Sequence, residues 1–189
     1  MKKHTFEEIE ACLRECKYFW ETQITAHYKP EPASEESIQE VEKTLGLKFP
    51  PDYRRFLLKW GFLEFCYTYS HEIYGIVHDD PKQDKYGSVL GLTLDCREYA
   101  ELPEHYIAFY SDEGDEIWCI DTQDPDERVV VWDFFGHYLA RIVIYSFVDM
   151  LYQFAANERR VIIDDQGWLL DEKNEEYEEV DEFVWKNLV

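Results

Sequence analysis

Two short helical patterns joined by a proline-marked link, within residues 34–65, constrain the fold of this chain more than any other feature. The first begins after Ser34, a favourable N-cap, and stops at Gly46, a favourable C-terminal residue. Its apolar stripe is made of Ile38, Val41 and Leu45. This spacing predicts an amphipathic helix whose acidic residues, Glu42 included, face water.

The second pattern follows at once and opens on Pro50 and Pro51, because a proline at the first helical position loses only an N–H that has no partner there. Gly61 is expected to end it. Its apolar face is made of Tyr53, Phe56, Leu57 and Trp60. Because helices this short cannot bury their stripes alone, the tyrosine- and valine-rich strands that follow are expected to cover them.

The order of these features resembles the opening signature of the SUKH superfamily, which contains the Smi/Knr-type fungal cell-wall regulators and many bacterial immunity proteins. The residues that carry this resemblance are Ile38, Glu42, Gly46, Pro50, Tyr53, Phe56, Leu57 and Gly61. Two later segments resemble the family as well: a strand, acidic turn and returning strand in YIAFYSDEGDEIWCIDT, and a closing helix that starts Ser-Phe-x-x-x-Leu at Ser146. The family's turn usually has more glycine, whereas here four acids surround Gly114.

The remaining patterns extend this core on both sides. Thr5 and Glu8 have capping-box spacing and predict an N-terminal helix that continues to about residue 23. The strands are expected at 65–69, 72–77, 106–110, 116–121 and 128–134, with a possible extension at 136–144, and further helices at 88–99 and 146–157. After the core, a hairpin is expected at 160–164 and 167–170, and an acidic amphipathic helix at 174–189.

Together these patterns predict one α+β domain over residues 1–189, in which helices pack on an antiparallel sheet of about five or six strands. Its predicted parts are an N-terminal helix region (1–33), a SUKH-like core (34–157) and an acidic C-terminal extension (158–189). The aromatic content of 17% excludes a disordered chain. No apolar run approaches the roughly 20 residues of a membrane helix, and the N-terminus lacks a signal-peptide pattern, so we expect a cytosolic protein.

Cysteine usage agrees with a reducing compartment. The five cysteines are an odd number at no paired spacing: Cys12, Cys16, Cys66, Cys96 and Cys119. Cys12 and Cys16 lie four residues apart on a predicted helix and have the spacing of zinc ligands, but no nearby histidine completes a site. Burial as small apolar side chains is the favoured interpretation.

Charge is the outlier of the composition, because 19 basic residues face 41 acidic residues and give a net charge of −22. Such a field repels nucleic acid and anionic membranes and attracts basic proteins. Residues 111–127 carry eight acids and no lysine or arginine, at both ends of one predicted strand: Asp112, Glu113, Asp115, Glu116, Asp121, Asp124, Asp126 and Glu127. A second acidic region spans 164–189. The acids either bind a basic partner or only keep the protein in solution.

Catalytic patterns are absent from the sequence. It has no glycine-rich phosphate loop, no His-Glu-x-x-His helix and no Gly-x-Ser-x-Gly elbow, and its six histidines are scattered. Asp121, Asp124 and Asp126 are closely spaced but lack the glycine and distal glutamate of a calcium loop. We therefore expect no catalytic residues, no metal and no cofactor. A hydrolase that uses two of the many carboxylates is the alternative.

The function favoured by these patterns is binding. The resemblance implies an immunity protein that neutralises a toxin, and the charge implies that this toxin is basic, a nuclease being one example. The eight acids at 111–127 are the predicted contact residues. The alternative is a scaffold or regulatory module of the Smi/Knr type, which would bind other proteins without any toxin.

Overall fold

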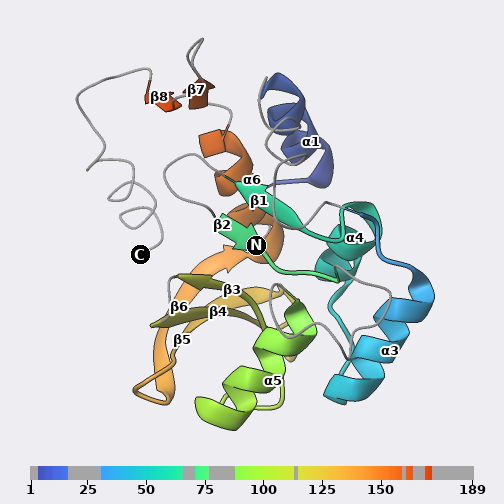
Figure 1. Ribbon diagram of the computed structural model, residues 1–189, viewed down its shortest axis with the longest axis vertical. Coiled ribbons are helices and arrows are strands. Elements are labelled where there is room, and N and C mark those ends of the chain that lie inside the picture. Colours follow the sequence, from blue (N-terminus) through green and yellow to red (C-terminus); the bar gives the residue numbers. More distant parts are fainter. Residues whose placement is uncertain are drawn as a thin grey trace.

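The computed structural model describes residues 4–16, 31–65, 71–76, 88–112, 115–158, 161–163 and 169–171 (Figure 1). The helices of this part of the chain are α1 (Phe6–Glu15), α3 (Glu35–Leu45), α4 (Pro51–Lys59), α5 (Val89–Tyr99) and α6 (Phe147–Glu158). The strands are β1 (Leu63–Phe65), β2 (His71–Ile73), β3 (Tyr106–Asp112), β4 (Glu116–Asp121), β5 (Arg128–Asp133), β6 (Tyr138–Ser146), β7 (Val161–Ile163) and β8 (Leu169–Asp171). The predicted α+β class is confirmed.

Most helices begin where a side chain binds a free backbone N–H of the first turn. Thr5 and Glu8 form the predicted capping box of α1, and Ser34 accepts a hydrogen bond from the Ser37 N–H at the start of α3. Ser88 caps α5 and Ser146 caps α6 in the same way. Each cap satisfies a donor that the helix itself cannot pair, so these starting points were predictable from local sequence.

Helix ends agree with the prediction except in α1. Gly46 ends α3 in the left-handed conformation, at φ 72°, which glycine adopts without steric cost. The helix expected to reach residue 23 ends at Glu15, because Cys16 has extended backbone angles. Residues 17–23 lie outside the described part of the chain, and so does the helix predicted at 174–189.

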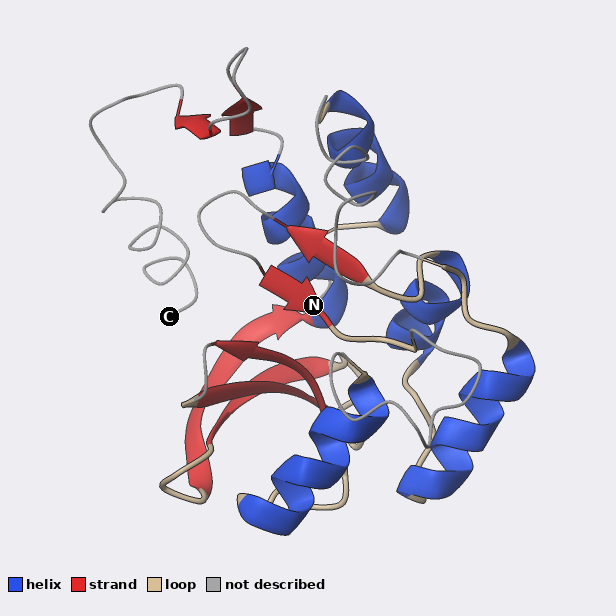
Figure 2. Ribbon diagram, in the orientation of Figure 1, coloured by secondary structure: helices blue, strands red, loops and turns tan. Residues whose placement is uncertain are grey.

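Four antiparallel strands form the central sheet, in the order β3-β4-β5-β6 (Figure 2). The prediction of one sheet of five or six strands is corrected. Among the described residues, β1 and β2 form a separate ladder, and β7 and β8 form another. β2 still lies beside β3, where the Tyr74 N–H donates to the Phe109 carbonyl at 2.8 Å. With three residues each, β1 and β2 are too short to continue the ladder along β3.

The sheet is buried on both faces. One face carries Phe109, Trp118 and Val131 and packs into the main core with α1, α3, α4 and α6. The opposite face carries Ala108, Cys119, Val130 and Trp132 and packs against α5 through Cys96 and Ala100. Figure 2 shows α5 below the strands, apart from the helices that gather above and beside them. β6 is the last strand on one side of this arrangement.

A close crossing of three chain segments at Gly61 fixes the β1–β2 pair. The Ile76 N–H donates to the Gly61 carbonyl at 3.0 Å, and a Cβ on Gly61 would lie 1.8 Å from the Glu31 carbonyl oxygen. Gly61 also has φ +71°, so only glycine fits this position. Gly61 was predicted to end the second helix, and it lies two residues beyond the end of α4 at Lys59.

Candidate functional site

The acids predicted at the β3–β4 turn lie at one end of the sheet. Asp112 is the last residue of β3, Glu113 lies outside the described residues, and Asp115 is exposed. Glu116 is half-buried and accepts two hydrogen bonds from the Arg141 guanidinium of β6, at 2.7 and 2.6 Å. This bidentate pair neutralises Glu116 locally and links β6 to β4 across β5.

The acids of the β4–β5 turn lie at the other end of β4. Asp121 accepts a hydrogen bond from the Gln123 N–H at 2.9 Å, and Asp124 accepts one from the Asp126 N–H at 2.8 Å. Asp124 also contacts the Arg128 Nε at 3.1 Å. These carboxylates therefore stabilise the turn through hydrogen bonds to its backbone, in addition to giving it negative charge. Asp126 is exposed.

Glu127 does not belong to the acidic surface. Its side chain is 7% exposed, and its carboxylate accepts hydrogen bonds from the N–H groups of Asp52 and Tyr53 at 2.9 and 3.3 Å. A carboxylate at this place caps α4 and is favoured by the positive end of the helix dipole. Glu127 has φ 54°, a conformation that is uncommon for residues other than glycine. We therefore withdraw it from the predicted contact residues.

The remaining acids form two groups and not one surface. The six residues of β4 separate the groups by about 17 Å, at a rise of about 3.4 Å per residue. The prediction that they sit at the two ends of one strand agrees with the bounds of β4, because Asp115 directly precedes Glu116, whereas Asp124 and Asp126 follow Asp121. One flat partner surface can contact either group alone, or reach both only along the length of the sheet.

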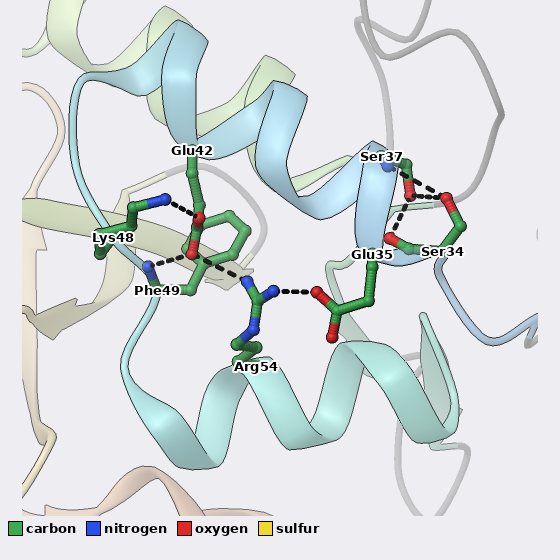
Figure 3. A network of polar contacts seen from close by, with 7 residues as sticks. All are labelled: Ser34, Glu35, Ser37, Glu42, Lys48, Phe49 and Arg54. Carbon is green, nitrogen blue, oxygen red and sulfur yellow. Dashed lines mark hydrogen bonds and ion pairs between the residues drawn. The ribbon is translucent and has the colours of Figure 1, made fainter.

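The fold-signature residues have structural roles, and Glu42 is the most connected among them (Figure 3). The prediction that Glu42 faces water is wrong, because the residue is 3% exposed. Its carboxylate accepts hydrogen bonds from the Lys48 Nζ at 2.6 Å, the Phe49 N–H at 3.0 Å and the Arg54 guanidinium at 3.0 Å. Arg54 also pairs with Glu35. Glu42 thus joins α3, the proline link and α4.

The other signature residues fill the core around this network. Ile38, Tyr53, Phe56 and Leu57 are fully buried in the main core. Gly46 and Gly61 are the described glycines with positive φ. The Tyr53 hydroxyl donates to the Tyr74 carbonyl at 2.6 Å, and burial raises the pKa of this phenol. Pro50 is buried at the start of α4. None of these side chains is placed to act on a ligand from solvent.

One constellation has the residue types of a hydrolytic triad but the wrong connectivity. The Ser146 hydroxyl donates to Asp149 at 3.0 Å, and the His4 Nδ1 lies 2.9 Å from the same carboxylate. A triad needs the serine to bond the histidine, whereas here both bond the aspartate. The His4 N–H also donates to Asp149 at 2.7 Å. Asp149 is therefore the residue that holds the N-terminus of α1 against α6.

The buried thiols are not activated for nucleophilic chemistry. Burial, together with the charge of Asp95, raises the pKa of Cys96 to about 12, and burial raises the pKa of Cys119 as well. Cys12 and Cys16 are buried thiols that form no disulfide, and their burial agrees with the favoured interpretation. The described residues contain no group of three histidine, cysteine or acidic side chains that could hold a metal.

The feature that sequence reasoning missed is an exposed apolar group on the hairpin formed by β5 and β6. It consists of Phe135, Tyr138, Leu139 and Ile142. The sequence offered a signal, because 138–144 is rich in apolar residues. That signal alone does not show exposure, since the same pattern fits an inner strand covered on both faces. The strand order places β6 at an edge.

Comparison with known proteins gives one finding on family. A search of curated proteins finds no match to the chain. A separate structural finding is that, in the described part of the chain, no helix has both the length and the apolar character needed to cross a membrane. The sequence model of SUKH_5, described as SMI1-KNR4 cell-wall, matches residues 7–156, a range that starts within α1 and ends within α6. The SUKH domains are generally non-catalytic and their members are often toxin-immunity proteins. This match covers most of the chain, which therefore belongs to the SUKH_5 family.

Proposed function

We propose that this protein is a non-enzymatic immunity protein that binds and neutralises a basic toxin. The observation that carries the proposal is the net charge of −22 on a chain that belongs to the SUKH_5 family. A basic toxin domain, such as a nuclease with a cationic substrate face, is the class of protein that such a field attracts. The encounter is proposed to take place in the cytosol.

The proposed mechanism is occlusion. Exposed carboxylates at the two ends of β4, among them Asp115 and Asp126, steer the cationic face of the toxin toward the sheet. Exposed aromatic side chains then supply affinity, as tyrosine and phenylalanine often do at the centre of protein interfaces. The bound toxin cannot reach its substrate because its cationic face is covered. No bond is made or broken in this mechanism.

Two measurements test the proposal. The first is co-expression of this protein with the product of the adjacent reading frame, where rescued growth supports immunity and unchanged killing contradicts it. The second is the association rate of the purified pair. We expect this rate to fall at least about tenfold between low and high salt, because salt screens steering charges over about 10 Å. A rate that does not depend on salt would remove steering from the mechanism.

A second candidate is a scaffold or regulatory module, which the description of the matched family as SMI1-KNR4 cell-wall favours. Such a module would use the same sheet to bind proteins of its own cell. Toxicity separates the two candidates. If the bound protein is harmless when it is expressed alone in the same host, the scaffold is supported and the immunity proposal fails.

A further inference from the structure

The hairpin of β5 and β6 carries an apolar surface that no other part of the fold covers among the described residues. We define the β6 patch as Phe135, Tyr138, Leu139 and Ile142, which are 72%, 54%, 38% and 51% exposed. These are four of the seven large apolar side chains that are exposed in the described chain, and the other three are spread over α4 and α5. Leu139 and Ile142 share one face of the sheet, opposite Trp132 and Val130, whereas Tyr138 lies opposite Asp133 and points to the other face. Exposed apolar side chains gathered on one hairpin are typical of a contact site.

β6 is an edge strand of the described sheet, and it lacks the lysine and proline residues that often protect an edge. It is the longest described strand, with nine residues, and it ends the order β3-β4-β5-β6. Edges are normally guarded by lysine, proline or inward-pointing charges. β6 contains neither lysine nor proline, and its only charged residue, Arg141, is held by Glu116. Its pairing with β5 has two register shifts, one between Arg128 and Val130 and one between Val131 and Trp132, and bulges of this kind are its protective devices.

The register explains why two of the patch residues are exposed. Ile142 lies opposite Val130 and Leu139 opposite Trp132, so both point to the face that α5 covers. α5 packs over Val130 and Trp132, and the Trp132 Nε1–H donates to the Ala100 carbonyl at 2.8 Å. It does not extend over β6. The result is an exposed apolar strip, formed by Leu139 and Ile142, beside a strand that pairs with no further strand among the described residues.

The charges around the β6 patch are mostly negative. Glu101, which follows α5, lies 3.4 Å from the His137 Nδ1 at the hairpin tip, and Asp133 accepts the Gly136 N–H in the same turn. Asp115 is exposed at the adjacent β3–β4 turn. A second copy of this chain would bring its own −22 charge to this surface and be repelled. A lysine- or arginine-bearing segment is attracted instead.

We infer that the β6 edge binds an extended, cationic segment of the partner as an added strand. Main-chain hydrogen bonds to β6 give affinity, and apolar side chains at alternate positions of the segment pack on the apolar strip of Leu139 and Ile142. Cationic side chains on the same segment meet Asp115, Asp133 and Glu101. This inference rests on the proposed function and names the contact surface, which the acidic turns alone do not define.

The first test uses a probe of this chemistry and needs no known toxin. The probe is an end-blocked nine-residue peptide that alternates lysine with valine and tyrosine, titrated into the ¹⁵N-labelled full chain up to about 1 mM. We expect amide shift changes concentrated on 134–143. A matched peptide with alternate backbone amides methylated keeps its charge but cannot pair as a strand, and its binding should be at least about tenfold weaker.

Three outcomes would overturn the inference. Shifts centred on 121–126, or equal binding of both peptides, would show simple charge attraction. Protection of the outer β6 amides from exchange in the free protein, independent of concentration, would show that another segment of the same chain occupies the edge. Protection that grows with protein concentration would show that a second copy does.

The second test uses variants and the toxin identified by co-expression. Ile142→Lys adds an edge charge and removes apolar area, and it should weaken toxin binding at least about tenfold. Leu58→Lys is the matched control, because Leu58 is 38% exposed on α4. Circular dichroism confirms that both variants fold. If growth rescue and affinity survive Ile142→Lys, the β6 inference fails while the immunity proposal stands. If the wild type gives no rescue, the immunity proposal fails, and the peptide titration alone decides the inference.

Discussion

Asp126 and Glu127 are adjacent acids with different environments. Asp126 is exposed, whereas Glu127 is buried against the first turn of α4. Glu127→Gln should therefore lower the free energy of unfolding by about 1–2 kcal/mol, because it removes a charged cap from a helix N-terminus. Asp126→Asn should change it by less than about 0.5 kcal/mol. Urea denaturation at pH 7 measures both, and equal effects would contradict the cap.

His71 is a second residue whose environment predicts a measurable effect. Its Nδ1 lies 2.8 Å from the Tyr110 hydroxyl, and burial lowers its pKa to about 4. Since an unfolded histidine titrates near 6.5, the unfolded chain binds a proton that the folded chain refuses. The contribution of His71 to stability is thus complete above about pH 6.5 and is lost as the pH falls toward about 4.

We expect this loss to amount to roughly 2–3 kcal/mol across that range. Many acids of this chain titrate in the lower part of the same range, so the informative quantity is a difference. The measurement is the unfolding free energy of the wild type and of His71→Phe between pH 7 and pH 4.5. The curve of the variant should lack the decrease assigned to His71. Parallel curves would show that His71 is protonated in the folded protein.

At the scale of elements, the pairing of α3 with α4 depends on Glu42. Its buried carboxylate binds Arg54, Lys48 and the Phe49 N–H, which come from the link and from α4. Glu42→Gln should cost about 2–3 kcal/mol, because the amide cannot accept from all three donors and leaves Arg54 without its buried partner. Lys48 is largely exposed and should contribute little.

The matched control for Glu42 lies on the same helix. Glu36→Gln changes an exposed acid in the first turn of α3 and should change stability by less than about 0.5 kcal/mol, because the loss of a favourable helix-dipole contact and the relief of like-charge repulsion oppose each other. Thermal and urea unfolding of both variants compare the sites. A Glu42→Gln protein as stable as the control would mean that the network shown in Figure 3 does not hold the helices together.

Elements that are fixed by contacts between nearby residues were predictable from the sequence, whereas elements fixed by contacts between distant segments were not. Ser34, Ser88 and Ser146 cap helices through residues three positions away, so these helices began where they were expected. The first strand pair did not follow its predicted bounds, because the crossing at Gly61 and the contact of Tyr74 with Phe109 fix it. Those contacts join distant segments and leave no local pattern.

The same reasoning explains the candidate site. The acidic turns at the two ends of β4 were predictable, because a hairpin places its turns there. The burial of Glu127 was not predictable, since the Asp52 N–H that it binds lies 75 residues earlier in the chain. The β6 patch was missed because its exposure depends on the strand order and on which strands α5 covers. The local pattern of apolar residues in 138–143 determines neither of them.

At the scale of the whole molecule, the net charge of −22 should make the folded state sensitive to salt even without a partner. Like charges that folding brings together repel one another, and salt screens this repulsion more than it weakens the ion pairs with short, partly buried geometry. We expect the free energy of unfolding to rise by about 1–2 kcal/mol between low salt and about 0.5 M sodium chloride.

Removing charged side chains separates two effects of salt on stability. Salt screens the repulsion between acids, and it also strengthens the burial of apolar surface whatever the charge of the protein. Glu36→Gln, Asp95→Asn and Asp115→Asn replace three exposed acids on α3, on α5 and at the β3–β4 turn. The triple variant should be more stable than the wild type at low salt and should gain less from added salt, because fewer charges remain to be screened. Urea midpoints at low and high salt provide the comparison. An equal salt response in both proteins would show that the acids lie too far apart for their repulsion to lower the free energy of unfolding. In that case the binding of a basic partner would relieve no repulsion within this chain.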